Sequence, residues 1–244
     1  MLKNQSRIQF ILLILASCLL GFGAELQAEN GKWEYVFAPY LQGASIDGTV
    51  AVRGQVAEID VSFSEAFENL EFGFQGHFEA SNDKWIVLGD LTYLGLGVGS
   101  TTPDAEIDFN QWLIEGGAGY RINENFETLF GGRFNRIDGT IEFHGPLGVK
   151  LQGDQSWFDP YIGGRLHIPA GKRGEVMVRG DIGGFGVGSD FAWTLTPTVV
   201  FRATDRISIA AFYRWINVDR ENEDDGFIYD VLTSGPGAGF AFHF

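Results

Sequence analysis

The sequence FIYDVLTSGPGAGFAFHF, residues 227–244, alternates regularly toward its carboxyl end. Every second residue counted back from the end belongs to an aromatic and apolar row: Phe244, Phe242, Phe240, Ala238 and Pro236. The residues between them are small or polar: His243, Ala241, Gly239, Gly237 and Gly235. Because successive side chains of a β-strand point to opposite faces, the stretch predicts a strand with one apolar face. Such a face either packs against a second sheet or contacts lipid, and the rest of the chain decides between these.

The same alternation recurs upstream in segments long enough to cross a bilayer at a tilt, which takes about 9 to 11 residues. The predicted strands are residues 33–42, 70–80, 84–97, 107–121, 126–137, 157–168, 175–186, 191–201, 206–219 and 227–244. Aromatic residues near the strand ends are typical of the girdles at a membrane interface. The expected girdle residues are Trp33, Trp85, Tyr93, Trp112, Tyr120, Trp157, Tyr213 and Trp215.

The connections between these segments are alternately short and long. Short turns are expected at residues 81–83, 123–125, 169–174 and 204–205. Longer connections are expected at residues 44–69, 101–106, 138–156, 183–190 and 220–226, the first with a hairpin over 49–59 and a helical turn over 64–68. Tight periplasmic turns and longer external loops are typical of outer-membrane barrels. We therefore predict an all-β, antiparallel, up-and-down transmembrane β-barrel over residues 29–244, with about ten strands and eight or twelve as alternatives. A soluble periplasmic β-sandwich binding protein is the competing interpretation.

Composition limits the function. The chain has 244 residues, 34 Gly, 22 Phe and a formal net charge of −15. This acidic balance, with no basic patch, argues against a nucleic-acid partner, because phosphates favour Lys and Arg. The single cysteine, Cys18, leaves no disulfide framework and no cysteine metal site.

The amino terminus has the features of a secretory signal over residues 1–28. Lys3 and Arg7 precede an apolar run, residues 8–20, that is too short for a transmembrane helix. Cleavage is expected after Ala28 or Ala24. Alternatively, residues 15–18 (LASC) match a lipobox, which would make Cys18 the lipidated first residue. Both routes predict export from the cytoplasm, and with the barrel pattern they predict the outer membrane of a Gram-negative bacterium.

Charged residues occupy the face predicted to line the lumen. Opposite charges in a narrow, low-dielectric interior are expected to pair. They would then form either a structural plug or a charged, porin-like narrow channel, and small barrels are usually filled by side chains. The residues expected to plug the lumen or set its selectivity are Glu71, Glu79, Asp90, Glu115, Arg133, Asp159, Arg165, Arg179, Asp181 and Arg214.

Signals for catalysis or cofactors are weak. His77, His167 and His243 are expected near the periplasmic end, which leaves His144 as the external histidine that a rim enzyme acting on lipid or peptide would need. The glycine-rich residues 183–188 precede a strand pattern rather than a helix, which does not fit a phosphate loop. The acidic residues 219–225 are expected to be solvated rather than an ordered cation site. We expect no enzyme activity, cofactor or metal.

Several stretches resemble an uncharacterised family of bacterial outer-membrane β-barrel proteins in the OmpA-like small-barrel class. They are residues 33–54 (WEYVFAPYLQGASIDGTVAVRG), 90–97 (DLTYLGLG), 157–165 (WFDPYIGGR), 180–193 (GDIGGFGVGSDFAW) and 240–244 (FAFHF). The resemblance implies an architecture and no settled activity. It implies that Phe240, Phe242 and Phe244 form the signal read by the barrel assembly machinery. The expected partners are outer-membrane lipid, lipopolysaccharide and that machinery, for a monomeric barrel.

Overall fold

The computed structural model describes residues 32–244 except 53–54, 69, 103–104, 144–149 and 223–225, so the expected signal segment lies outside the described residues. Residues 33–244 form one compact unit. No helix in the described ranges is long and apolar enough to cross a membrane. The elements of this unit are β1 (Glu34–Gln42), β2 (Ser45–Val52), β3 (Gln55–Val61), α2 (Phe63–Glu68), β4 (Leu70–Ser81), β5 (Trp85–Thr102), β6 (Ala105–Asn123), β7 (Phe126–Phe143), β8 (Lys150–Ala170), β9 (Gly174–Gly183), β10 (Phe191–Arg202), β11 (Ile207–Asn222) and β12 (Phe227–His243).

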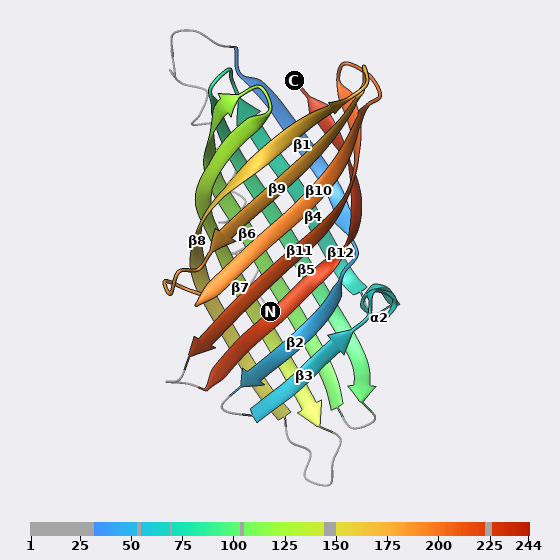
Figure 1. Ribbon diagram of the computed structural model, residues 1–244. Helices are drawn as coiled ribbons and strands as arrows, with labels where there is room; N and C mark the ends of the chain where they lie inside the picture. Colours follow the sequence, from blue (N-terminus) through green and yellow to red (C-terminus); the bar gives the residue numbers. More distant parts are fainter. Residues whose placement is uncertain (1–31, 53–54, 69, 103–104, 144–149, 223–225) are drawn as a thin grey trace, which may run out of the picture. The chain divides into compact units, whose positions relative to one another are not determined.

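Ten of these strands form a closed antiparallel barrel (Figure 1). The strands follow the order β1, β4, β5 and onward to β12, and β1 pairs back onto β12. In this closing pair Val36 lies opposite His243, and Gln42 lies opposite Gly237. Closure satisfies the backbone groups that an open sheet edge would expose to lipid. The predicted ten-stranded barrel is therefore confirmed.

Strands β2 and β3 form a hairpin that continues the line of β1. β2 pairs with β12 through Ser45–Ser234 to Ala51–Ile228, just beyond the part of β12 that β1 occupies. Gly43 lies between β1 and β2, and its amide donates to the carbonyl of Pro236 at 3.0 Å. The hairpin thus begins at residue 45 rather than at the expected residue 49.

Several strands extend further toward the long-loop end than the sequence predicts. β7 reaches Phe143 and β8 begins at Lys150, so much of the expected external loop 138–156 is a β-ladder. β9 ends at Gly183, before the expected residue 186. As a result, β5 to β8 form one extension and β11, β12, β2 and β3 form another, with the short β9–β10 connection between them. Sequence alternation fails here because the outer face of a strand that lies beyond the membrane does not have to be apolar.

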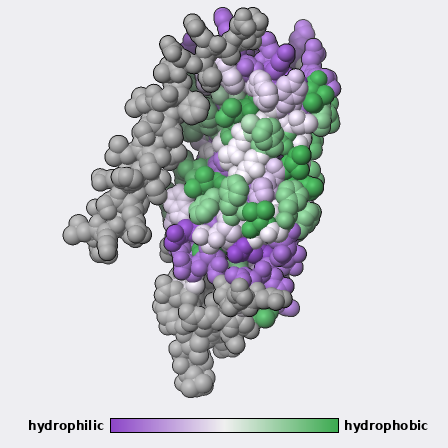
Figure 2. Space-filling view, turned by 90° about the vertical axis from the view of Figure 1, so that its left-hand side faces the viewer, coloured by the Kyte–Doolittle hydropathy of each residue, from purple (hydrophilic) through white to green (hydrophobic). Residues whose placement is uncertain are grey.

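On the face shown in Figure 2, apolar side chains gather across the middle of the barrel, with hydrophilic surface above and below them. Exposed apolar side chains such as Phe74, Ile114, Phe130, Ile162 and Val199 come from strands all around the barrel. The rings of Trp85 and Tyr120 pack at 5.1 Å near the short turns, and those of Tyr93 and Trp112 pack at 4.5 Å near the other border. The eight residue steps from Trp112 to Tyr120 span about 26 Å along the strand and about 20 Å in height at the usual tilt of roughly 40°. This height fits the apolar band of outer-membrane barrels, which is about 25 Å tall.

Candidate functional site

The candidate site is the interior of the barrel, where charged side chains gather on one half of the wall. Glu79, Asp90, Glu115, Arg133, Asp159, Arg165, Arg179, Asp181 and Arg214 all point into the lumen, on the alternate positions that the sequence predicts. The side chain of Glu71 lies outside the described residues. Most of the inward charges form two groups, one near the short turns and one at mid-height.

The group near the short turns surrounds Arg165 of β8. Its guanidinium donates two hydrogen bonds to Glu79 of β4, at 2.5 and 3.0 Å, and Nε donates to Glu127 of β7 at 2.7 Å. His167 reaches the same Glu127 carboxylate at 3.1 Å, and also Glu175 at 2.5 Å. One arginine therefore ties three strands together across the barrel interior. Bidentate, charge-assisted bonds of this kind are among the strongest that proteins form.

The group at mid-height surrounds Arg133 of β7, which donates to Glu115 at 2.8 Å and to Asp181 at 2.6 Å. Arg179 of β9 reaches the same two carboxylates, at 2.6 and 3.3 Å. The hydroxyl of Tyr161 donates to Glu115 at 3.1 Å, and the Arg133 guanidinium lies 4.6 Å from the centre of the Tyr161 ring. Two arginines and two carboxylates thus neutralise each other inside the membrane-spanning part of the barrel.

Glycines of neighbouring strands make room for Tyr161. A Cβ atom at Gly117 of β6 or at Gly131 of β7 would run into its hydroxyl group. Both glycines occupy inward positions opposite one another in the β6–β7 ladder. The glycine content of these strands therefore serves packing in the lumen as well as strand geometry.

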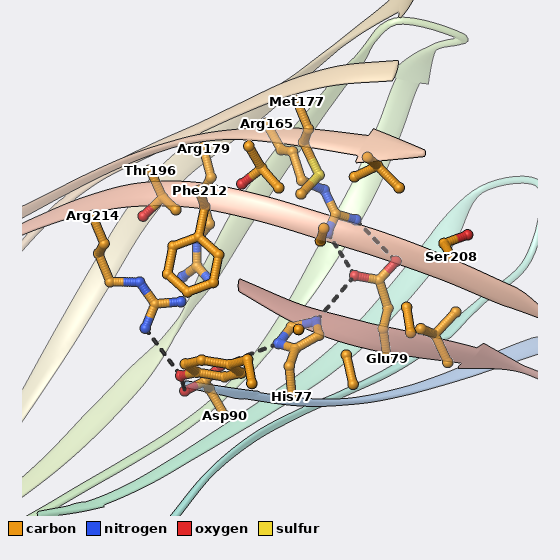
Figure 3. Close-up of a pocket in the computed structure, with 18 of the residues that line it drawn as sticks. His77, Glu79, Asp90, Arg165, Met177, Arg179, Thr196, Ser208, Phe212 and Arg214 are labelled. Atoms are coloured by element: carbon orange, nitrogen blue, oxygen red, sulfur yellow. Dashed lines mark hydrogen bonds and ion pairs between the residues drawn. The ribbon is translucent and has the colours of Figure 1, made fainter. Parts of the chain in front are cut away.

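A hydrogen-bonded relay joins β11 to the charged half through Tyr40 of β1. Arg214 donates to the Tyr40 hydroxyl at 3.0 Å, and this hydroxyl donates to Asp90 at 2.7 Å. Asp90 in turn lies 3.3 Å from Nδ1 of His77, whose other ring nitrogen lies 3.7 Å from Glu79. Figure 3 shows this chain of side chains continuing from Arg214 to Arg165.

Asp159 departs from the expectation that inward acids pair with arginines. Its carboxylate accepts hydrogen bonds from the Trp157 indole at 2.9 Å, from Asn135 at 3.2 Å, and from the amide and hydroxyl of Ser189 at 2.6 and 2.9 Å. Four neutral donors replace the arginine. They fix the β9–β10 connection against β8, because Ser189 belongs to that connection.

Trp157 is not part of the outer girdle, which corrects the prediction. It is 5% exposed and lies in an apolar cluster inside the barrel at the long-loop end. We call this group the external apolar cluster; its members are Ile137, Trp157, Ala192, Val218, Phe227, Tyr229 and Val231. The cluster joins the two extensions, since its residues come from β7 and β8 on one side and from β11 and β12 on the other.

Three of the four histidines lie in the described part of the chain. His77, His167 and His243 line a cavity that extends to the short-turn end, whereas His144 lies outside the described residues. Nε2 of His243 lies 2.9 Å from the hydroxyl oxygen of Ser208, a contact that the sequence does not reveal because the two residues are 35 positions apart. No carboxylate hydrogen-bonds to His243 in the described part of the chain.

The residues of the expected assembly signal lie on the outer surface. Phe240, Phe242 and Phe244 are 54%, 37% and 79% exposed. Phe240 and Phe242 lie in the outward row of β12, and Phe244 follows the end of that strand.

No protein-family model matches the sequence, and no curated protein matches it. Among solved structures, the outer-membrane protease OmpT from Escherichia coli has a TM-score of 0.50 at 9% identity, over 90% of this chain and 100% of that one. The translocator domain of the autotransporter NalP from Neisseria meningitidis has a TM-score of 0.45 at 10% identity, over 99% and 98% of the two chains. The attachment invasion locus protein Ail of Yersinia pestis has a TM-score of 0.37 at 14% identity, over 87% and 98%. At these identities the likeness concerns the fold, which is that of bacterial outer-membrane β-barrels.

Proposed function

We propose that this chain is an integral outer-membrane protein whose barrel is closed to solutes and whose role in the membrane is structural. The observation that carries the proposal is the external apolar cluster, which fills the lumen where a pore would need its outer mouth. In outer-membrane barrels the short turns face the periplasm. The cluster would therefore face the outside.

The energy of the cluster supports a closed state. Trp157, Tyr229 and Val231 are 5%, 6% and 2% exposed. Burying a large apolar side chain stabilises by about 1.5 to 3 kcal/mol. Separating the two extensions would expose several such side chains at once, at a cost of roughly 5 kcal/mol or more. At that cost the open population would be about one molecule in several thousand.

A narrow passive pore is the second candidate, and one observation favours it. A cavity of about 280 Å³ at the short-turn half and another of about 60 Å³ beyond it share Leu113, Arg214 and Ile216 in their walls. Movement of these three side chains would join the cavities into a longer passage. The external apolar cluster would still have to part before ions could cross.

Planar-bilayer recording separates the two candidates. The closed barrel predicts no steady current in the wild type at any voltage, and a current when Trp157→Ala is combined with Tyr229→Ala. A steady, ion-selective wild-type current that changes on Arg179→Ala would instead establish the passive pore. Heat-shifted gel mobility of each variant serves as the folding control.

The remaining assignments are part of the same proposal. We assign the chain no catalytic role and no cofactor, and we expect the monomer to contact outer-membrane lipid and lipopolysaccharide. Recognition of Phe240, Phe242 and Phe244 by the assembly machinery predicts that Phe244→Ala lowers the amount of folded protein in the outer membrane. Unchanged assembly of that variant would remove this role.

A further inference from the structure

The cavity of about 280 Å³ reaches from the short turns to mid-height of the barrel. At one end it is lined by His167, Glu175 and His243, which are inward residues next to the short turns. At the other end it is lined by Leu113, Thr194 and Ile216. The space is therefore a pocket that approaches the periplasmic rim, and its volume lies near the lower limit of small-molecule sites, which is about 300 Å³.

The pocket has two unlike walls (Figure 3). The charged wall comes from β4 to β9 and carries the arginine and carboxylate groups described above. The opposite wall comes from β10, β11, β12 and β1. Besides Arg214 and His243, it carries mostly small, apolar or hydroxylated residues, among them Thr194, Thr196, Thr198, Val200, Ser208, Ala210, Phe212, Ala241, Val36 and Ala38. Because most of these side chains are small, they do not fill the space beside the charged wall.

Arg214 differs from the three arginines of the charged wall. Arg133, Arg165 and Arg179 each contact two carboxylates, whereas Arg214 forms no ion pair with a carboxylate among the described residues. Its one hydrogen bond goes to the Tyr40 hydroxyl, and its side chain borders the pocket. The guanidinium lies 5.2 Å from the centres of the Tyr40 and Phe212 rings, but most of its five N–H donors have no hydrogen-bond partner among the described residues.

Burying a guanidinium that has no carboxylate partner costs free energy, unless an anion or water hydrogen-bonds to it. A carboxylate matches the fork with two parallel hydrogen bonds and carries a single charge. Alanine and valine side chains of the wall opposite the charged one extend from the level of Arg214 toward the short-turn rim. They offer an apolar track, which spans about 20 Å along the strand from Arg214 to Ser208.

We infer that the pocket binds a small amphiphile with one carboxylate head group. The head pairs with Arg214, and a short apolar tail lies along Val200, Ala210 and Ala241. The ligand enters and leaves at the short-turn end, so binding is compatible with a barrel that is closed at its outer mouth. The inference goes beyond the structural role and does not require conduction.

The test uses the full barrel folded into phosphatidylcholine vesicles, with hexanoate as the probe and equilibrium dialysis as the assay. Vesicles that carry no protein give the lipid background. We expect saturable binding of one hexanoate per barrel at neutral pH, and binding at least about tenfold weaker in Arg214→Gln, because a hydrogen bond to a charged group is lost. Arg136→Gln is the matched control, since Arg136 lies on the outer surface, paired with Asp138. Its affinity for hexanoate should equal that of the wild type.

A second variant and a set of comparison ligands test the inference if Arg214→Gln folds poorly. Ala241→Leu narrows the track without touching Arg214 and should weaken hexanoate more than acetate, which has almost no tail. Hexylammonium and hexanol should bind at least about tenfold more weakly than hexanoate, because they lack the anionic head. Equal binding of hexanoate to the wild type and Arg214→Gln, or no saturable binding in wild type, would overturn the inference. Tighter binding of hexyl phosphate than of hexanoate would overturn the choice of a carboxylate.

Discussion

Replacing Arg165 by methionine should be far more costly than the same change at the exposed Arg136. Arg165 is 7% exposed and grips Glu79 with bonds of 2.5 and 3.0 Å, while also contacting Glu127, which is 2% exposed. Arg165→Met would leave two buried carboxylates without their arginine. Removing one partner of a buried ion pair costs about 3 to 5 kcal/mol.

Arg136 provides the comparison, because it also makes two bonds to a carboxylate. It contacts Asp138 at 3.0 and 3.1 Å, but the two side chains are 49% and 39% exposed. Exposed pairs contribute about 0 to 1 kcal/mol. Arg136→Met should therefore change the free energy of unfolding by no more than about 1 kcal/mol.

The assay is equilibrium urea unfolding of both variants in lipid vesicles, followed by tryptophan fluorescence and gel mobility. A double variant, Arg165→Met with Glu79→Gln, should recover part of the loss, because one of the two orphaned charges disappears. Equal costs for Arg165→Met and Arg136→Met would refute the idea that the inward ion pairs are buried and mutually dependent.

Three more changes test the packing and the loop. Trp157→Ala should lower the free energy of unfolding by about 3 to 5 kcal/mol in the same urea assay, because it removes a large side chain from the external apolar cluster. Gly117→Ala should cost about 1 to 3 kcal/mol through overpacking, whereas Gly116→Ala, whose added Cβ meets nothing within 4 Å, should be nearly neutral; equal costs would contradict the packing described. The hydroxyl and then the amide of Ser62 hydrogen-bond Glu65 and hold its pKa below the usual range. These two hydrogen bonds should therefore stabilise the fold fully at pH values above the pKa of Glu65 in the unfolded chain. Their contribution should be lost as the pH falls through the lowered pKa of Glu65 in the folded chain. An NMR titration should show a higher Glu65 pKa in Ser62→Ala. An unchanged pKa would mean that the Ser62 hydroxyl does not lower it.

The sequence predicts the fold because lipid imposes a strict period on the strands. Between the girdles, each outward residue must be apolar, so the alternation that begins at Phe244 can be followed into every barrel strand. Where strands extend past the girdle at the long-loop end, outward residues no longer have to be apolar. Asp138 and Asp154 face each other in a regular β7–β8 ladder, yet their segments show no period and predict a loop.

The lumen is predicted only in part. The alternation of side chains along each strand places Arg133, Glu115 and Asp181 inside the barrel. It does not say which strands face each other across the lumen. The contact of Arg165 with Glu79 joins residues 86 positions apart, and it depends on strand stagger rather than on any local pattern. The sequence predicts Trp157 to be a girdle residue, because a tryptophan near a strand end is typical of a girdle. The structure instead uses its indole to cap Asp159 inside.

The central claim is a lumen closed toward the outside and accessible from the periplasm. Cysteine accessibility tests it directly, because Cys18, the one native cysteine, lies in the segment expected to be removed or lipidated. Thr196→Cys places a thiol in the pocket wall. A charged, membrane-impermeant thiol reagent should leave this cysteine unlabelled in intact cells and label it after osmotic opening of the periplasm. Labelling from outside intact cells would contradict the account.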